Sequence, residues 1–315
     1  MSICIPAYND WPLLAKCLES IAANYGTAVQ TIVVVNGSTD ETSQRLGLRD
    51  GLEVVISGAR VGIAAALNLA IDRARSEAVL ILDSDMTVLP GAIEAMVDVL
   101  ADHPTAGAVA CERVNPDLSF QSQLIPLPTL ASEVMMRWHL AGLLRAWRPL
   151  DAPRSDTETI DCALPAGGLM VRGAALAALG GFDEQFASAY HDVDLCARLL
   201  SAGYDIWFTR RAMVIHDMAS PLKQPASSSR AEIWLQLVSY HRKHGGRMAA
   251  LVAAMVLYVA IVPEVLLVGW RWLRRPSQRV ELARSLRGNL GLLNRAVAAG
   301  LIRRATAATT AVPLP

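Results

Sequence analysis

The sequence predicts an α/β fold built on a doubly wound, mostly parallel sheet. The first observation is a repeated alternation of short apolar runs with stretches in which apolar residues recur at helical spacing. The second is that the apolar runs end in polar residues and glycines, as parallel strands do where their carboxyl ends line a cleft. Residues 78–82 show this most clearly, because five apolar residues lead directly into Asp83, Ser84 and Asp85.

Residues 1–112 form the first half of the predicted domain. Short apolar runs predict strands at residues 2–5, 31–35, 53–56, 78–82 and 107–111. Helical spacing predicts a helix that begins at Asp10, with Pro12 in its first turn, and further helices over residues 63–74 and 91–100. No Gly-x-Gly-x-x-Gly motif or P-loop follows the first strand, which argues against a dinucleotide-dependent dehydrogenase and a P-loop enzyme.

Residues 113–220 form the second half of the domain. Residues 113–161 are irregular, with three prolines between Pro116 and Pro128, and we interpret them as an insertion. The alternation then returns, with strands expected at residues 169–171, 205–209 and 213–215 and helices at 174–179 and 191–200. Residues 221–315 differ in composition and are treated as a separate tail.

The charge of the chain is unevenly distributed between these parts. Residues 1–220 contain 15 Lys and Arg against 26 Asp and Glu, whereas residues 221–315 contain 14 against 3, which indicates different partners for the two parts. The five cysteines have no zinc or redox spacing, so we expect reduced, buried thiols in a cytosolic setting; they are Cys4, Cys17, Cys111, Cys162 and Cys196. No basic segment of a signal peptide precedes the first strand.

The tail is predicted to be helical, apolar and basic. Residues 229–244 have amphipathic spacing, and residues 249–270 are almost all apolar, close to the ~20 residues that span a bilayer. Glu264 and the flanking basic residues favour a helix that lies in the membrane interface or packs on a partner subunit, with a spanning helix as the alternative. Basic tails also bind nucleic acid, but no nucleic-acid-binding module accompanies this one.

The two aspartates after the strand at residues 78–82 are candidate metal ligands. Carboxylates two residues apart can hold a hard divalent cation such as Mg²⁺, which prefers oxygen ligands and shares them with phosphates. The alternative is a simple turn, because aspartate and serine both favour turns.

Six motifs together make the chain resemble the family 2 glycosyltransferases over residues 1–245. They are Pro6-Ala-Tyr-Asn, Val34-Val-Asn-Gly-Ser-Thr-Asp40, Leu82-Asp-Ser-Asp85, Gly180-Gly-Phe-Asp-Glu184, His191-Asp-Val-Asp-Leu195 and Val214-Ile-His216. The resemblance implies a Rossmann-like GT-A fold and an inverting enzyme that uses nucleotide-diphosphate sugars. The likeness is greatest to bacterial rhamnosyltransferase-like enzymes, which build cell-surface polysaccharide.

The resemblance also implies a role for individual residues. Asp83, Asp85 and His216 would hold Mg²⁺ or Mn²⁺. The donor would be bound by a set drawn from the loops after the first strands, namely Pro6, Ala7, Tyr8, Asn9, Asn36, Ser38, Arg60, Asn68, Asp83 and Ser84. The acceptor would lie against Gly180, Gly181, Asp183 and His191, and residues 1–112 and 113–220 would be the donor and acceptor halves.

Asp192 matches the aspartate that serves as general base in the family. An inverting displacement needs a carboxylate that removes the proton of the attacking hydroxyl. A helix cap is the alternative role for Asp192, as a structural role is for the solitary His216. Two positions depart from the family pattern, because Val35 replaces an aspartate near the base and His191 replaces a glutamate.

We therefore expect a metal-dependent glycosyltransferase on the cytoplasmic face of the cell membrane, peripheral or anchored by a single helix. Candidate donors are dTDP-rhamnose and UDP-sugars, and the acceptor would be a glycan or a polyprenyl-diphosphate-linked saccharide. The basic tail would contact the membrane surface, and a homodimer is a second fate for its apolar residues. The rival classes are a non-catalytic scaffold with the same fold, suggested by the departures at Val35 and His191, and a sugar-nucleotide nucleotidyltransferase. The latter would need a glycine-rich basic loop after the first strand.

Overall fold

The computed structural model describes residues 1–137, 155–217 and 230–274, together with residues 291, 294 and 298. The chain divides into two compact units, and each is described by itself. The first contains residues 1–127, 150–224 and 310–315, and the second contains residues 128–149 and 225–309.

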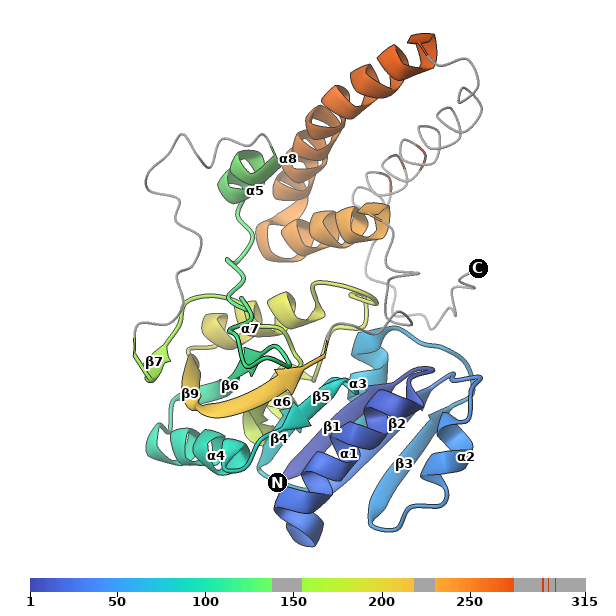
Figure 1. Cartoon of the computed structure of the whole chain (residues 1–315). Helices are drawn as coiled ribbons and strands as arrows, with labels where there is room; N and C mark the ends of the chain where they lie inside the picture. Colours follow the sequence, from blue (N-terminus) through green and yellow to red (C-terminus); the bar gives the residue numbers. More distant parts are fainter. Residues whose placement is uncertain (138–154, 218–229, 275–290, 292–293, 295–297, 299–315) are drawn as a thin grey trace. The chain divides into compact units, whose positions relative to one another are not determined.

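The first four strands of the first unit form the expected parallel sheet. β1 (Ser2–Ala7), β2 (Gln30–Asn36), β3 (Leu52–Ser57) and β4 (Ala78–Ile81) lie in the order β3-β2-β1-β4, and every pair among them is parallel. Helices α1 (Trp11–Tyr25), α2 (Thr42–Leu46) and α3 (Ile63–Ile71) connect them (Figure 1). A parallel pair needs such a crossover, which is why strands and helices alternate in the sequence.

The rest of the sheet is mixed, so the expectation of a mostly parallel sheet needs correction. The full order is β3-β2-β1-β4-β8-β6-β9-β5, with β7 (Thr157–Thr159) paired to β9. β8 (Leu169–Arg172) is antiparallel to both of its neighbours, β4 and β6 (Ala106–Val114). β5 (Met86–Val88) is antiparallel to β9 (Asp205–His216). Between β6 and β8, the described residues of this unit (115–127 and 155–168) contain no crossover helix, the connection that a parallel pairing of successive strands requires.

β9 is a single strand where the sequence suggested two. Its parallel pairing with β6 shifts register between Cys111, opposite Thr209, and Glu112, opposite Met213. The extra residues on β9 form an irregularity of the kind that bends a strand near a functional site. This irregularity coincides with the break in the sequence pattern, and beyond it β9 continues to His216.

Helices cover both faces of this sheet. Ile3 and Ile5 of β1 belong to a buried cluster with α1 and with α4 (Ala92–Asp102), on one face. The alternate residue Cys4 is also fully buried and points to the opposite face, where α3 packs on β1 and β2. The remaining helices are α6 (Gly173–Leu179) and α7 (His191–Ser201). All five cysteines are buried and free, as predicted.

The second unit contains α5 (Leu130–Arg137) and α8 (Arg230–Arg274), which contact each other. α8 is two helical segments that meet at Gly246, whose φ of 76° and ψ of −171° are not helical. The second segment continues through Pro263 to Arg274. Among the helices that the structure describes, none is both long and apolar enough to cross a membrane. The part of the tail after residue 274 lies outside the described residues, apart from 291, 294 and 298.

Candidate functional site

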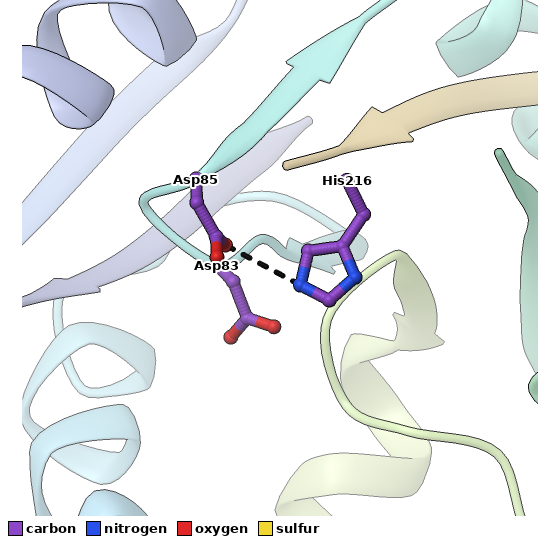
Figure 2. A group of neighbouring side chains, drawn as sticks. All are labelled: Asp83, Asp85 and His216. Carbon is purple, nitrogen blue, oxygen red and sulfur yellow. Dashed lines mark ion pairs between the residues drawn. The ribbon is translucent and has the colours of Figure 1, made fainter. Parts of the chain in front are cut away.

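The candidate site is built on the turn between β4 and β5. The amide of Leu82 donates to the carbonyl of Cys4 (3.0 Å), which extends the pairing with β1, and the amide of Met86 donates to the carbonyl of Asp83 (3.1 Å), which closes the turn. β5 then pairs with β9, with Met86 opposite His216. This register carries the histidine at the end of β9 to the two aspartates (Figure 2).

Asp83, Asp85 and His216 form a cluster of metal-ligating side chains. Their ligand atoms all lie within 4.8 Å of one another, and Nε2 of His216 lies 3.5 Å from Oδ1 of Asp85. Asp85 and His216 are buried, and Asp83 is half-buried. Two ionised carboxylates held this close repel each other, which a divalent cation between them would offset. Oxygen and imidazole ligands of this kind suit Mg²⁺ or Mn²⁺.

The absence of a side chain at Gly167 makes room for the carboxylate of Asp83. A Cβ atom at residue 167 would lie 2.3 Å from Oδ2 of Asp83 and 2.7 Å from Cε of Met86. Only glycine therefore leaves room for the carboxylate in its present position. The backbone and the donor set thus both fit a bound cation.

Ser84, between the two aspartates, points away from the cluster. Its hydroxyl donates to Oδ2 of Asp10, and both side chains are buried. Asp10 stands at the N-cap of α1, as predicted, but its side chain makes no capping hydrogen bond there; its carbonyl accepts the first bonds of the helix, from the amides of Leu13 and Leu14 (3.0 Å each). Its carboxylate instead fixes the turn between β4 and β5, so the predicted donor-binding residue Ser84 has a structural partner.

Asn9 joins the loops after β1 and β2, where predicted donor-binding residues lie. Its backbone amide donates to Oγ of Ser38 (3.1 Å), and its side-chain Oδ1 accepts from the backbone amide of Thr39 (2.7 Å). Pro6 and Ala7, also predicted, are the last residues of β1. The loops thereby form one surface at the carboxyl ends of β1 and β2.

Tyr8 and Arg60 form a stacked pair on that surface. The guanidinium of Arg60 lies over the ring of Tyr8, 4.0 Å from its centroid, and Tyr8 is 37% exposed. Gly37, with φ of 67°, allows this approach, because a Cβ there would lie 2.4 Å from the Arg60 nitrogen. A planar cation on an exposed aromatic ring can stack with a nucleotide base.

The side chains of Asn36 and Asn68 bond to the backbone of other loops. Asn36 accepts from the amide of Val61 (2.8 Å) and donates to its carbonyl (3.0 Å). Asn68 makes the same paired contacts with Phe182, at 2.9 Å each, and also donates to Glu184 (3.0 Å). The two residues, both predicted to bind the donor, therefore hold the loops around the site.

The residues predicted to face the acceptor lie between the end of α6 and the start of α7. Gly180 and Gly181 have φ of 71° and 73°, and the carbonyl of Gly181 accepts from Arg198 (2.9 Å). Arg198 also forms an ion pair with the fully buried Asp194 (2.7 Å). Arg198 therefore links the turn at Gly180 and Gly181 to α7. Asp183 has a local role as well, since its Oδ1 accepts from the amide of Gln185 (3.1 Å).

Asp192 and His191 open α7. Oδ1 of Asp192 accepts from the amide of Val193 (2.8 Å), and the half-buried carboxylate has no other hydrogen bond among the described residues. The ring of His191 lies 5.8 Å from that of Phe182, and its buried Nδ1 lacks a hydrogen-bond partner in the described part of the chain.

Sequence reasoning missed the residues that surround His216. Arg113 and Gln121 both contact its Nδ1, and Gln121 also contacts Asn115. Arg113 is the second-last residue of β6, Asn115 and Gln121 follow the strand, and none of the three belongs to a motif. The polar run at the end of an apolar strand was the only available signal for Arg113.

Residues 2–143 match the family model described as Glycosyl transferase family 2. Among curated proteins, the chain is similar to N-acetylglucosaminyl-diphospho-decaprenol L-rhamnosyltransferase of Mycobacterium tuberculosis, with 27% identity over 262 residues that cover 76% of this chain and 83% of that protein. It is also similar to the pre-mycofactocin glycosyltransferase of the same organism, with 28% identity over 225 residues that cover 71% of this chain and 44% of that protein.

Among solved structures, the fold resembles that of the mannosyltransferase PcManGT from Pyrobaculum calidifontis, determined with GDP-Man and Mn²⁺. The TM-score is 0.53 at 19% identity, and the match covers 96% of this chain and 86% of that one. At this identity the likeness bears on the fold alone, and it agrees with the GT-A-like α/β fold and mixed sheet described above.

Proposed function

We propose that this chain is a family 2 glycosyltransferase, an inverting, metal-dependent enzyme that moves a sugar from a nucleotide-diphosphate sugar to a lipid-linked saccharide. The observation that carries the proposal is the cluster of Asp83, Asp85 and His216 at the end of β4. The name of the mycobacterial rhamnosyltransferase supports the acceptor class and makes dTDP-rhamnose a leading donor candidate, beside UDP-sugars.

On the donor side, the stacked pair of Tyr8 and Arg60 would receive the nucleotide base. Stacking on an aromatic ring or a guanidinium holds a base without requiring a particular pattern of hydrogen bonds. Asp83, Asp85 and His216 would bind Mg²⁺ or Mn²⁺. When bound, the ion neutralises charge on the departing nucleoside diphosphate.

On the acceptor side, Asp192 would act as the general base. The acceptor hydroxyl oxygen forms a bond to the anomeric carbon, its proton passes to the Asp192 carboxylate, and the bond from carbon to the diphosphate oxygen breaks with its electron pair on the diphosphate. Because Oδ1 is held by the Val193 amide, Oδ2 is the oxygen available to take the proton. Attack opposite the leaving group inverts the anomeric centre.

Donor turnover tests the proposal directly. The chain should release nucleoside diphosphate when it is incubated with Mn²⁺ and the correct member of a panel that includes dTDP-rhamnose and UDP-sugars. EDTA and Asp85→Ala should each abolish release, and Asp192→Asn should lower transfer by about 10²–10⁴-fold, the usual contribution of a general base. No release with any donor would instead support the non-catalytic scaffold.

A surface on the second unit supports contact with a membrane. Met248, Val252, Met255 and Val259 recur at helical spacing along α8 and are all exposed, and the basic residues just before them, including Lys243 and Arg247, are exposed too. An apolar stripe next to basic residues suits an anionic lipid surface, where a lipid-linked acceptor would be found. We therefore propose a peripheral enzyme on the cytoplasmic face of the membrane.

Vesicle co-sedimentation tests this location. The full chain should bind vesicles that contain phosphatidylglycerol more strongly than vesicles of phosphatidylcholine, and Met255→Glu should weaken that binding. Ile233→Glu is the matched control, because Ile233 is an exposed apolar residue on the other segment of α8. Unchanged vesicle binding by Met255→Glu, or a dimer that this substitution dissociates, would contradict the membrane assignment.

A further inference from the structure

Two neighbours of His216 make opposite demands on the same ring nitrogen. The Nη2 of Arg113 lies 2.6 Å from Nδ1, and Oε1 of Gln121 lies 2.9 Å from it. A guanidinium only donates hydrogen bonds, so it needs a lone pair on Nδ1, whereas a carbonyl oxygen only accepts and needs a proton there. A neutral imidazole can satisfy one of these neighbours at a time.

The orientation of the Gln121 amide is fixed by its other contacts. Its Nε2 donates to the backbone carbonyl of His216 (3.0 Å) and to Oδ1 of Asn115 (2.8 Å). A backbone carbonyl has no proton to give, so the group that faces it must be the NH₂, and the oxygen must face the imidazole. Gln121 is therefore an acceptor set against Nδ1.

A hairpin after β6 brings both neighbours to His216. The backbone amide of Gln121 donates to the backbone carbonyl of Arg113 (2.9 Å), and Val114 forms an antiparallel β-bridge with Phe120. Arg113 and Val114 in turn pair with the last residues of β9 before His216. The two side chains that compete for Nδ1 thus lie side by side at one end of the histidine ring.

Each choice of partner has a consequence at the opposite ring nitrogen, Nε2. With the proton on Nδ1, bonded to Gln121, Nε2 presents a lone pair toward Asp85 and can ligate a metal ion. With Arg113 as the partner of Nδ1, the proton lies on Nε2 and faces Oδ1 of Asp85, and the histidine cannot act as a ligand. Among the described residues, Arg113 makes no ion pair and its buried Nε has no hydrogen-bond partner, so its contact with Nδ1 is the hydrogen bond that its guanidinium makes there.

We propose that Gln121 is a positioning residue that sets His216 in its metal-binding tautomer, and that Arg113 stabilises the alternative tautomer of the metal-free site. The inference depends on the metal site of the proposed function but not on the sugar or the acceptor. It assigns opposite effects to two side chains that contact the same atom, which general damage to the fold would not produce.

Mn²⁺ binding to the full chain, followed by the electron paramagnetic resonance signal of free Mn²⁺ without any donor, tests the assignment. Gln121→Leu should weaken Mn²⁺ binding by about 10–100-fold, the usual cost of losing a partner of a ligating histidine. Gln121→Glu keeps an acceptor for the Nδ1 proton and should bind at least as tightly as wild type. Arg113→Leu removes both a competitor and a positive charge, so its binding should be no weaker than that of wild type.

The ¹⁵N shifts of the His216 ring report the tautomer without any variant. In the wild-type protein with Mg²⁺ bound, the ring proton of His216 should be on Nδ1. A ring that keeps its proton on Nε2 with Mg²⁺, equal losses in Gln121→Leu and Arg113→Leu, or no Mn²⁺ binding by the wild type would each overturn the inference. Mn²⁺ binding that behaves as expected in a chain that turns over no donor would instead reject the proposed function alone.

Discussion

Replacing Gly167 with alanine should disable the site without unfolding the protein. The new Cβ would lie 2.3 Å from Oδ2 of Asp83, where ordinary contacts begin at 3.4 Å, so the carboxylate must move by about 1.1 Å. The atoms in its way are the ends of the Asp83 and Met86 side chains, which can rotate. Gly167 has no positive φ, so the backbone tolerates alanine.

A displacement of this size is large for a catalytic group. Misplacing a reacting group by about 1 Å can cost about 10²-fold in rate, which corresponds to about 2.7 kcal/mol of transition-state stabilisation. We therefore expect Gly167→Ala to lower donor turnover by about 10²-fold and to weaken Mn²⁺ binding, with a thermal unfolding midpoint close to that of wild type.

Gly47→Ala is the matched control, because its Cβ would make only ordinary contacts of 3.6 Å and 3.7 Å at the end of α2. Both variants should be compared with wild type in nucleoside diphosphate release and in calorimetry. If Gly167→Ala kept its turnover within about threefold of wild type, the position of Asp83 could not matter as argued here. A large drop in its unfolding midpoint would show that Gly167 serves the fold instead.

Asp194→Ala should lower the free energy of unfolding by about 3–5 kcal/mol in urea titrations, because it leaves Arg198 without its fully buried partner; a change below about 1 kcal/mol would refute this role. Burial, and then the charge of a neighbouring histidine, lower the pKa of His241 from 6.5 to about 4, so the unfolded chain binds the proton more readily. The unfolding midpoint should therefore fall as the pH drops from about 6.5 to about 4, and less so in His241→Gln. Burial raises the pKa of Cys111 and of Cys196 to about 12, so at pH 8 a thiolate-specific reagent should label them only after denaturant is added.

The parallel half of the fold could be read from the sequence because its signals are local. A strand buried on both faces appears as an apolar run, and its parallel neighbour needs a helical crossover, so the alternation along residues 1–112 predicts β1 to β4 and their helices. The mixed half could not be read in this way. A short strand such as β8 has the same composition whichever direction it runs, and only its pairing with β4 and β6 decides that direction.

In the candidate site, too, some features could be predicted from the sequence and others could not. Asp83 and Asp85 were identifiable because they follow directly from a buried strand, and the order of the motifs added His216 and Asp192. The sequence could not show which polar side chains bond to the backbone of other loops. Asn36 and Asn68 look like ligand-binding residues in the sequence, yet their amides are bonded to the backbone of other loops.

By itself, the sequence determined the α/β class, the two aspartates at the end of a strand and the apolar, basic character of the tail, because periodicity and composition are properties of neighbouring residues. Only the tertiary structure decided which side chains share a hydrogen bond. The meeting of Arg113, Gln121 and His216 depends on a hairpin after β6 and on the register of β9. Hydrogen bonds form over about 3 Å between atoms that can lie about a hundred residues apart in the chain, so they are set by register and packing, which no local pattern encodes.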